Sequence, residues 1–177
     1  MYYLFEYFDE KSALKNIPIL NMITCEKEYL NEKFNELLEC LDNEVYKDGI
    51  VNPEDVKNAI REDTALVTIM YANNEIGTIE PIKELVKVSK RKGALFHTDA
   101  VQAAGHIPVN VKKLGVSMLS ASAHKFNGPK GVGIMYLRDT VKIGPFIHGG
   151  AQERGKRAGT HNTPGIVGFA EATRLAD

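Results

Sequence analysis

Hydrophobic and polar positions recur along this chain with periods that distinguish helices from strands. Apolar residues at three- and four-residue steps predict amphipathic helices over 26–41 and 81–92. A shorter helix is predicted over 53–60, because Asn52 is a good cap and Pro53 suits the first helical position. A further helix is predicted over 163–175. Short apolar runs predict strands over 66–70, 94–98, 116–120 and 132–137.

The order of these elements predicts the fold class. A strand, a helix and a second strand at this spacing indicate a right-handed parallel crossover. Continuous apolar strands are typical of a sheet that is covered on both faces. We therefore expect an α/β fold with a mostly parallel sheet flanked by helices. In such a sheet, ligand-binding groups gather where strands end and loops begin.

Composition narrows the class of protein. The 177 residues suffice for one domain, and 44% hydrophobic residues with a formal net charge of −1 indicate a soluble globular protein rather than a nucleic-acid binder. The aromatic start, 1–8, is followed by charged residues and resembles neither a signal peptide nor a membrane span. We expect a cytoplasmic location and no membrane partner. The two cysteines, Cys25 and Cys40, have no metal-ligand or disulfide-framework spacing, so no metal site is predicted.

Candidate chemistry lies where two of the predicted strands end. The segment 120–125 reads Ser-Ala-Ser-Ala-His-Lys and leads directly into a glycine-proline turn. A lysine amine becomes a useful nucleophile when its surroundings lower its pKa, and Ser122 and His124 stand beside Lys125. Asp99 follows the strand over 94–98, and an acid opposite a pyridine nitrogen is what pyridoxal phosphate needs as an electron sink. A lysine and an acid together predict a site for this cofactor.

Four motifs in order carry a family resemblance that runs from about residue 52 to about residue 172. They are Asn-Asn-Glu-Ile-Gly-Thr-Ile at 73–79, His-Thr-Asp-Ala-Val-Gln at 97–102, the segment 120–131, and Arg-Ala-Gly-Thr-His-Asn-Thr-Pro-Gly at 157–165. With these motifs the chain resembles the cysteine desulfurases of the NifS/IscS-like group. These are class V aminotransferase-like, fold-type I pyridoxal phosphate enzymes, so the resemblance implies the large domain of that fold, incomplete at both ends.

The resemblance implies roles for individual residues, each of which has a simpler alternative. Lys125 would hold the cofactor covalently and move protons at the substrate, although it could be a solvated loop lysine; Lys130 is the weaker candidate. Asp99 would keep the pyridine nitrogen protonated, or it could cap the following helix. Gln102 and Asn74 would hydrogen-bond the cofactor's phenolic oxygen and the substrate side of the ring, or serve only turns.

The remaining roles concern the phosphate, a second subunit and a protein partner. Ser122 and His124 would help to hold the phosphate. Thr160 would reach the phosphate of a neighbouring subunit, which implies a homodimer, or it is a loop hydroxyl. A satisfied core histidine and a site residue are equally reasonable interpretations of His97. The basic residues 154, 156 and 157 could contact an acidic sulfur-acceptor protein or the dimer mate, but a solvated loop is the commoner explanation.

The chain also departs from the resembled pattern. The phosphate-binding loop of the family is not found in 1–23, and Tyr29 stands near the place of the histidine that stacks on the cofactor. Ser117 stands where members of the family commonly have an acidic residue before the strand that leads to the lysine. The region that carries the persulfide-forming cysteine and the carboxylate-binding arginine has no counterpart, and neither cysteine occupies its place. We therefore divide the chain into a poorly matching segment, 1–24, and a partial pyridoxal phosphate-binding large domain, 25–177.

Two functional hypotheses follow. In the first, the chain belongs to a cysteine desulfurase that removes sulfur from L-cysteine, giving alanine and a persulfide for iron-sulfur cluster or thio-cofactor assembly. Selenocysteine remains open as the ancestral substrate. In the second, the chain is a truncated, catalytically inactive remnant that binds cofactor or dimerises. A phosphate or nucleotide module built on 128–133 ranks last, because the strand-to-helix loop with Lys-Ser/Thr is missing.

Overall fold

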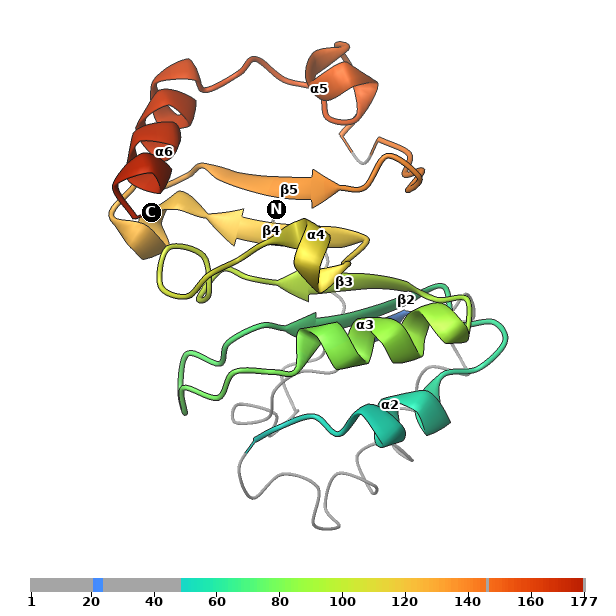
Figure 1. Cartoon of the computed structure of the whole chain (residues 1–177). Helices are drawn as coiled ribbons and strands as arrows, with labels where there is room; N and C mark the ends of the chain where they lie inside the picture. Colours follow the sequence, from blue (N-terminus) through green and yellow to red (C-terminus); the bar gives the residue numbers. More distant parts are fainter. Residues whose placement is uncertain (1–20, 24–48, 146, 177) are drawn as a thin grey trace, which may run out of the picture.

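A five-stranded sheet forms the centre of the protein, for which a computed structural model describes residues 21–23, 49–145 and 147–176 (Figure 1). The strands lie in sequence order: β1 (Asn21–Ile23), β2 (Leu66–Met70), β3 (Leu95–Asp99), β4 (Met118–Ser122) and β5 (Gly133–Leu137). The pairs β2–β3 and β3–β4 are parallel, whereas β1 and β5 add to the two edges in antiparallel orientation. The predicted α/β class is confirmed, and its parallel core is the part that carries the crossover connections.

Three of the predicted helices lie within the described residues and are present with small changes at their ends. They are α2 (Pro53–Ala59), α3 (Ile82–Arg91) and α6 (Thr163–Leu175). The strand β1 was not predicted, and neither were three short helical elements, namely α4 (Val111–Leu114), the 3₁₀ helix η1 (Ala123–Phe126) and α5 (Gln152–Gly155). Each of these three has four residues, which is too short for a helical period to show in the sequence.

Local chemistry explains where the longer helices begin and end. The Asn52 side chain accepts a hydrogen bond from the backbone N–H of Glu54 at 2.9 Å, which satisfies a donor that the first turn of α2 leaves open. At the C-terminal end of α3, Lys90 and Arg91 lie in the last turn, where positive side chains interact favourably with the negative end of the helix dipole. Gly93 follows with a φ of +83°, a conformation that ends the helix at little steric cost.

The hydrophobic core lies between the sheet and α3. Ile82, Leu85 and Val86 of α3 are almost fully buried and belong to one cluster with side chains of β2, β3 and β4. The strand residues of this cluster are Val67, Ile69, Phe96, Leu119 and Ala121. The helix α2 packs against α3 and adds Val56. In Figure 1, α3 lies across β2 and β3, and α2 lies beyond it, away from the sheet. Burial of this apolar face is the main favourable term that holds the parallel strands to the helices.

The two faces of the sheet are buried to different extents. The register aligns Val67 with Phe96 and Ile69 with Thr98, and these four side chains are fully buried on the face that α3 covers. The opposite face carries Thr68 and the other alternate residues of β2 and β3, which are mostly only partly buried. The helix α3 covers one of these faces. Met118 and Ser120 of β4 lie on the opposite face and are buried as well, so the expected burial of both faces is met in β4 and only partly met in β2 and β3.

Several predictions concern the N-terminal part of the chain. The helix over 26–41, the stacking position Tyr29, both cysteines and the domain boundary at residue 24 all lie outside the described residues. Only the backbone of β1 is described there, and its antiparallel pairing aligns Met22 with Val67.

Candidate functional site

The carboxyl ends of β2, β3 and β4 meet at one edge of the sheet. The register aligns Met70 with Asp99, and Asp99 with Ser120, so the three strands end side by side and point in one direction (Figure 1). Asp99 is the last residue of β3, one residue later than the predicted end of that strand. Ser122 is the last residue of β4, two residues beyond the predicted end, because β4 pairs with β5 as far as Ser122 and Gly133. The predicted convergence of these loops on one edge follows from this topology.

Lys125 lies in η1, directly after β4. The short helix is anchored on both sides: Gly128 N–H donates to the Ala123 carbonyl at 2.9 Å, and the His106 side chain hydrogen-bonds the Lys125 carbonyl at 2.9 Å. Phe126 is buried and its ring packs against Phe169 of α6, with centroids 5.5 Å apart. The backbone of Lys125 is thus held firmly, while its side chain is exposed.

The hydroxyl and imidazole that precede the lysine interact with each other. Ser122 Oγ lies 2.8 Å from His124 Nδ1, and this hydrogen bond fixes the orientation of the ring. The other ring nitrogen, Nε2, takes no part in it. His124 is exposed and Ser122 is partly buried at the end of the strand. Because the two groups share one hydrogen bond, a neutral ring leaves one donor of the pair for an anion: Nε2–H if the hydroxyl donates to Nδ1, or the hydroxyl if Nδ1–H donates to it.

Asp99 uses one carboxylate oxygen locally, which matches the simpler of its two interpretations; its role toward a cofactor stays a prediction. Its Oδ1 accepts a hydrogen bond from the backbone N–H of Val101 at 2.8 Å, so the carboxylate caps the turn that follows β3. Within the described part of the chain, Oδ2 has no hydrogen-bond partner. The backbone of Asp99 is held by its neighbours, because its carbonyl accepts from the Tyr71 N–H at 2.8 Å. One oxygen is therefore used locally and the other is available.

Asn74 and Gln102 lie in the turns after β2 and β3. The Asn74 side chain donates a hydrogen bond to Glu75 Oε1 at 2.8 Å. Among the described residues, it makes no hydrogen bond to another predicted site residue. The turn itself is made by Asn73, whose Oδ1 accepts from the backbone N–H groups of Glu75 and Ile76 at 2.8 and 3.1 Å. Gln102 is partly buried in the turn beyond Asp99. Asn73 therefore makes the side-chain hydrogen bonds that hold this turn.

His97 joins three strands, in the manner of the satisfied histidine that was one of its two interpretations. Its Nδ1 lies 2.6 Å from Thr68 Oγ1 on β2, and its Nε2 lies 3.2 Å from Ser120 Oγ on β4. All three side chains belong to the sheet face opposite α3, and His97 is two residues from Asp99 on that face. Both ring nitrogens are therefore satisfied, as in a structural histidine. The partners are 29 and 23 residues away, so no local pattern could have identified them.

This environment predicts a pH dependence of stability. Burial lowers the pKa of His97 below its ordinary value of 6.5, and the negative charge of Asp99 opposes that shift only in part. Between the lowered value and 6.5 the unfolded chain binds a proton that the folded chain does not, so the free energy of unfolding falls as the pH falls through this range. We expect His97→Gln to reduce this slope in urea unfolding measured from pH 7.5 downward. A matched change of the exposed His148 to Gln should leave the slope as it is, and an unchanged slope in the His97 variant would contradict the assignment.

Thr160 lies away from these strand ends in the sequence, in the segment between α5 and α6, and is exposed. The basic residues near it do not form one free cluster. Arg157 lies 3.6 Å from the carboxylate of Glu153, whereas Arg154 and Lys156 are exposed. Lys130, the weaker lysine candidate, is exposed in the turn before β5. Among the described residues, no group of histidine, cysteine and acidic side chains is arranged to hold a metal ion. No helix of the described part of the chain is both long and apolar enough to cross a membrane.

A lysine, an acid and a hydroxyl–imidazole pair lie at the carboxyl edge of the parallel strands, where sheets of this kind gather ligand-binding groups. Comparison with solved structures shows which proteins share this fold. A NifS-like protein superposes with a TM-score of 0.72 and 46% identity, covering 85% of this chain and 43% of the other. A structure described as SspA in complex with cysteine has a TM-score of 0.70 and 38% identity, covering 84% of this chain and 45% of the other. The sheet and helices are those of the large domain of fold-type I proteins.

Sequence comparison identifies the family. The aminotransferase class-V family matches residues 38–177. A cysteine desulfurase IscS of Methanosarcina thermophila is 60% identical over 132 residues, which cover 75% of this chain and 33% of the relative. A cysteine desulfurase IscS of Dictyoglomus turgidum is 61% identical over 132 residues, which cover 75% of this chain and 34% of the relative. The chain belongs to the aminotransferase class-V family, and it spans about one third of the length of the curated relatives it matches.

Proposed function

We propose that this chain is the lysine-bearing part of a pyridoxal phosphate-dependent cysteine desulfurase. The observation that carries the proposal is the exposed Lys125 on the anchored helix η1, beside a sheet edge at which β3 ends in Asp99. The identity of about 60% to relatives named cysteine desulfurase favours this function over that of an inactive remnant.

The donor set fits the cofactor in three respects. Lys125 offers an exposed amine for covalent attachment. Asp99 offers Oδ2, which has no hydrogen-bond partner within the described residues, for a protonated pyridine nitrogen. Ser122 and His124 together offer one donor for a phosphate, either the hydroxyl or Nε2–H. These are the residues that would hold the cofactor, with Gln102 and Asn74 as further hydrogen-bonding groups.

When bound, pyridoxal phosphate supplies an electron sink for the bonds at the α-carbon of an amino acid. The chain's residues then have separate tasks. The Asp99 carboxylate stabilises positive charge by its own negative charge, and its fixed backbone keeps Oδ2 in place. Lys125 Nζ would accept and return a proton at the substrate carbon. Ser122 and His124 would bind and orient the anionic group.

The proposal includes a homodimer in which Thr160 of one copy binds the phosphate held by the other. The exposed hydroxyl of Thr160 supports this part, because it is available to a second chain. It also includes L-cysteine as the substrate, supported by the solved relative described as in complex with cysteine. The sulfur would pass to an acceptor protein, with the exposed cations Arg154 and Lys156 as its contact, for iron-sulfur cluster or thio-cofactor assembly. A cytoplasmic location is part of the proposal, in keeping with only two cysteines in 177 residues.

The test is to load the full chain with pyridoxal phosphate, reduce it with borohydride, and map the adduct by peptide mass spectrometry. We expect one stoichiometric adduct on Lys125. In parallel, the loaded chain is given L-cysteine or L-selenocysteine, and alanine is measured. Alanine from either substrate supports a desulfurase and identifies which amino acid it prefers.

Each outcome decides a different part of the proposal. Adducts scattered over surface lysines, or no adduct, overturn the cofactor site. An adduct on Lys125 without alanine from either substrate overturns catalysis by this chain and favours the cofactor-binding remnant. A single mass corresponding to a monomer in light scattering of the loaded chain overturns the homodimer.

A further inference from the structure

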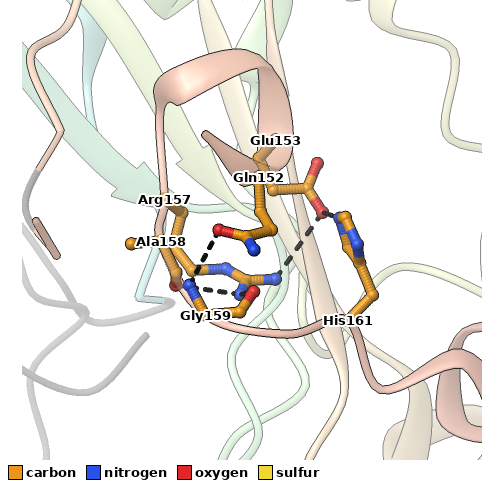
Figure 2. A network of polar contacts seen from close by, with 6 residues as sticks. All are labelled: Gln152, Glu153, Arg157, Ala158, Gly159 and His161. Carbon is orange, nitrogen blue, oxygen red and sulfur yellow. Dashed lines mark hydrogen bonds and ion pairs between the residues drawn. The ribbon is translucent and has the colours of Figure 1, made fainter. Parts of the chain in front are cut away.

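The loop that carries Thr160 is tied to α5 by a network of polar contacts, shown in Figure 2. Glu153 Oε1 lies 3.6 Å from Arg157 Nη2 and 3.1 Å from His161 Nε2, so one carboxylate oxygen bridges two side chains of the loop. Arg157 Nη1 donates to the carbonyls of Ala158 and Gly159 at 3.1 and 2.9 Å. Gln152 Oε1 accepts from the Gly159 N–H at 3.2 Å. We call Gln152, Glu153, Arg157 and His161 the loop frame.

The backbone that presents Glu153 is itself in an unusual conformation. Glu153 has a φ of 49° and Arg154 a φ of 59°, in the left-handed region that side chains with a Cβ rarely adopt. Such strain persists only where surrounding contacts over-determine the backbone, and it is commonest at functional sites. Glu153 is the residue whose side chain makes the bridging contacts. The strained turn therefore directs this carboxylate toward Arg157 and His161.

Thr160 stands at the centre of the segment that the loop frame holds. The residue before it, Gly159, is fixed at both its N–H and its carbonyl, and the residue after it, His161, is fixed at its side chain. The hydroxyl of Thr160 has no hydrogen-bond partner among the residues that the structure describes, and it is exposed. The surroundings thus fix the position of Thr160 and leave its functional group open.

We propose that the loop frame, with Glu153 as its central residue, positions the Thr160 hydroxyl for the phosphate of a cofactor bound by a second copy of the chain. This inference rests on the proposed function, and it adds positioning residues that make no contact with the cofactor themselves. Fixing a donor before binding saves the entropy of ordering the loop, so the benefit appears as affinity for the phosphate.

The sign of the charge effect separates positioning from simple electrostatics. Removing the Glu153 carboxylate makes the loop more positive, which by Coulomb attraction alone would tighten the binding of an anion. Positioning predicts the opposite, because a loosened loop no longer presents Thr160 correctly. A hydrogen bond to a charged group is worth a factor of about ten or more in affinity.

The experiment compares Glu153→Ala with Thr160→Ala, the double variant and Glu171→Ala in the full chain. Glu171 is a matched control, because it is an exposed glutamate paired with Arg174 at 2.6 Å on α6, outside the loop frame. The dissociation constants of pyridoxal phosphate and of pyridoxal, which lacks the phosphate, are measured by absorbance titration. We expect Glu153→Ala and Thr160→Ala each to weaken pyridoxal phosphate binding about tenfold and to leave pyridoxal unchanged. The double variant should be no weaker than Thr160→Ala alone.

A second measurement needs no cofactor. Hydrogen exchange of the backbone amides at 157–161 is compared in the unloaded chains, and we expect Glu153→Ala to accelerate exchange there while Glu171→Ala does not. Unchanged exchange would show that Glu153 does not order the loop and would overturn the inference. Equal weakening of pyridoxal and pyridoxal phosphate, tighter binding of the phosphate, or additive effects in the double variant would overturn it as well. Failure of the parent chain to bind pyridoxal phosphate overturns the proposed function, and with it the phosphate-directed role of the loop frame, whatever the exchange result.

Discussion

Replacing Lys125 with alanine is expected to abolish the borohydride-stable adduct of pyridoxal phosphate and to reduce labelling to the background of surface lysines. The physical reason is that a neutral methyl group cannot form a covalent bond to the cofactor's aldehyde. Lys125 is exposed and its backbone is held by η1, so its removal should leave the fold intact. Peptide mass spectrometry measures the adduct, and the urea midpoint checks the fold.

Lys130 provides the matched control for this prediction. It is also an exposed lysine, five positions further along the chain in the turn before β5, and Lys130→Ala should keep the full adduct on Lys125. An adduct of undiminished stoichiometry in Lys125→Ala would contradict the assignment.

Mixed dimers extend the same prediction to the second subunit. A chain with Lys125→Ala lacks the amine, and a chain with Thr160→Ala lacks the hydroxyl. If each site draws these two groups from different copies, a mixture of the two variants contains hybrid dimers with one complete site. Tight phosphate-dependent binding should then return on mixing. Its absence in hybrids of verified composition would contradict a shared site.

Replacing Gly105 with alanine is expected to destabilise the protein by about 2–5 kcal/mol and to lower the adduct yield on Lys125. Gly105 has a φ of +80°, and a Cβ there would lie 2.5 Å from the Cβ and 2.6 Å from the Cγ of Phe126. The left-handed conformation costs a residue with a Cβ about 1–2 kcal/mol. The clash with a buried ring adds about 1–3 kcal/mol, because a close-packed core yields only by shifting. Displacement of Phe126 also moves its neighbour Lys125.

Gly131 separates the two contributions. Its φ is +76°, and a Cβ there would have no neighbouring atom within 4 Å. Gly131→Ala should therefore cost only the conformational term of about 1–2 kcal/mol. Denaturant unfolding gives both values. Equal losses of stability in the two variants would mean that the contact between Gly105 and Phe126 is not what holds η1 in place.

Residues close in sequence account for most of the predictable structure. The amphipathic spacing of Ile82, Leu85 and Val86 determines which face of α3 is buried, and the cap at Asn52 determines where α2 begins. The contact between Ser122 and His124 is local as well, since the two residues are neighbours on either side of Ala123. The order of strands and helices was sufficient to predict that the ends of β2, β3 and β4 share one edge.

Contacts between residues distant in sequence required the folded chain. The row of Thr68, His97 and Ser120 exists because parallel pairing aligns three strands that are separated by helices and turns. The antiparallel orientation of β5, which extends β4 to Ser122, likewise depends on pairing rather than on composition. The bridge from Glu153 to Arg157 and His161 depends on a left-handed backbone at Glu153 and Arg154. This conformation favours glycine, so the residue types at these two positions gave no sign of it.

The sequence by itself determined α2, α3, α6 and the strands β2 to β5, the order in which they occur and the residue types that collect at the ends of the strands. Only the tertiary structure decided which face of the sheet α3 covers, which partners satisfy His97 and how the segment around Thr160 is held. The physical reason is the separation in sequence over which each interaction acts. Helical periods, caps and turns act between residues a few positions apart, whereas strand pairing, burial and polar bridges depend on the geometry of the whole fold.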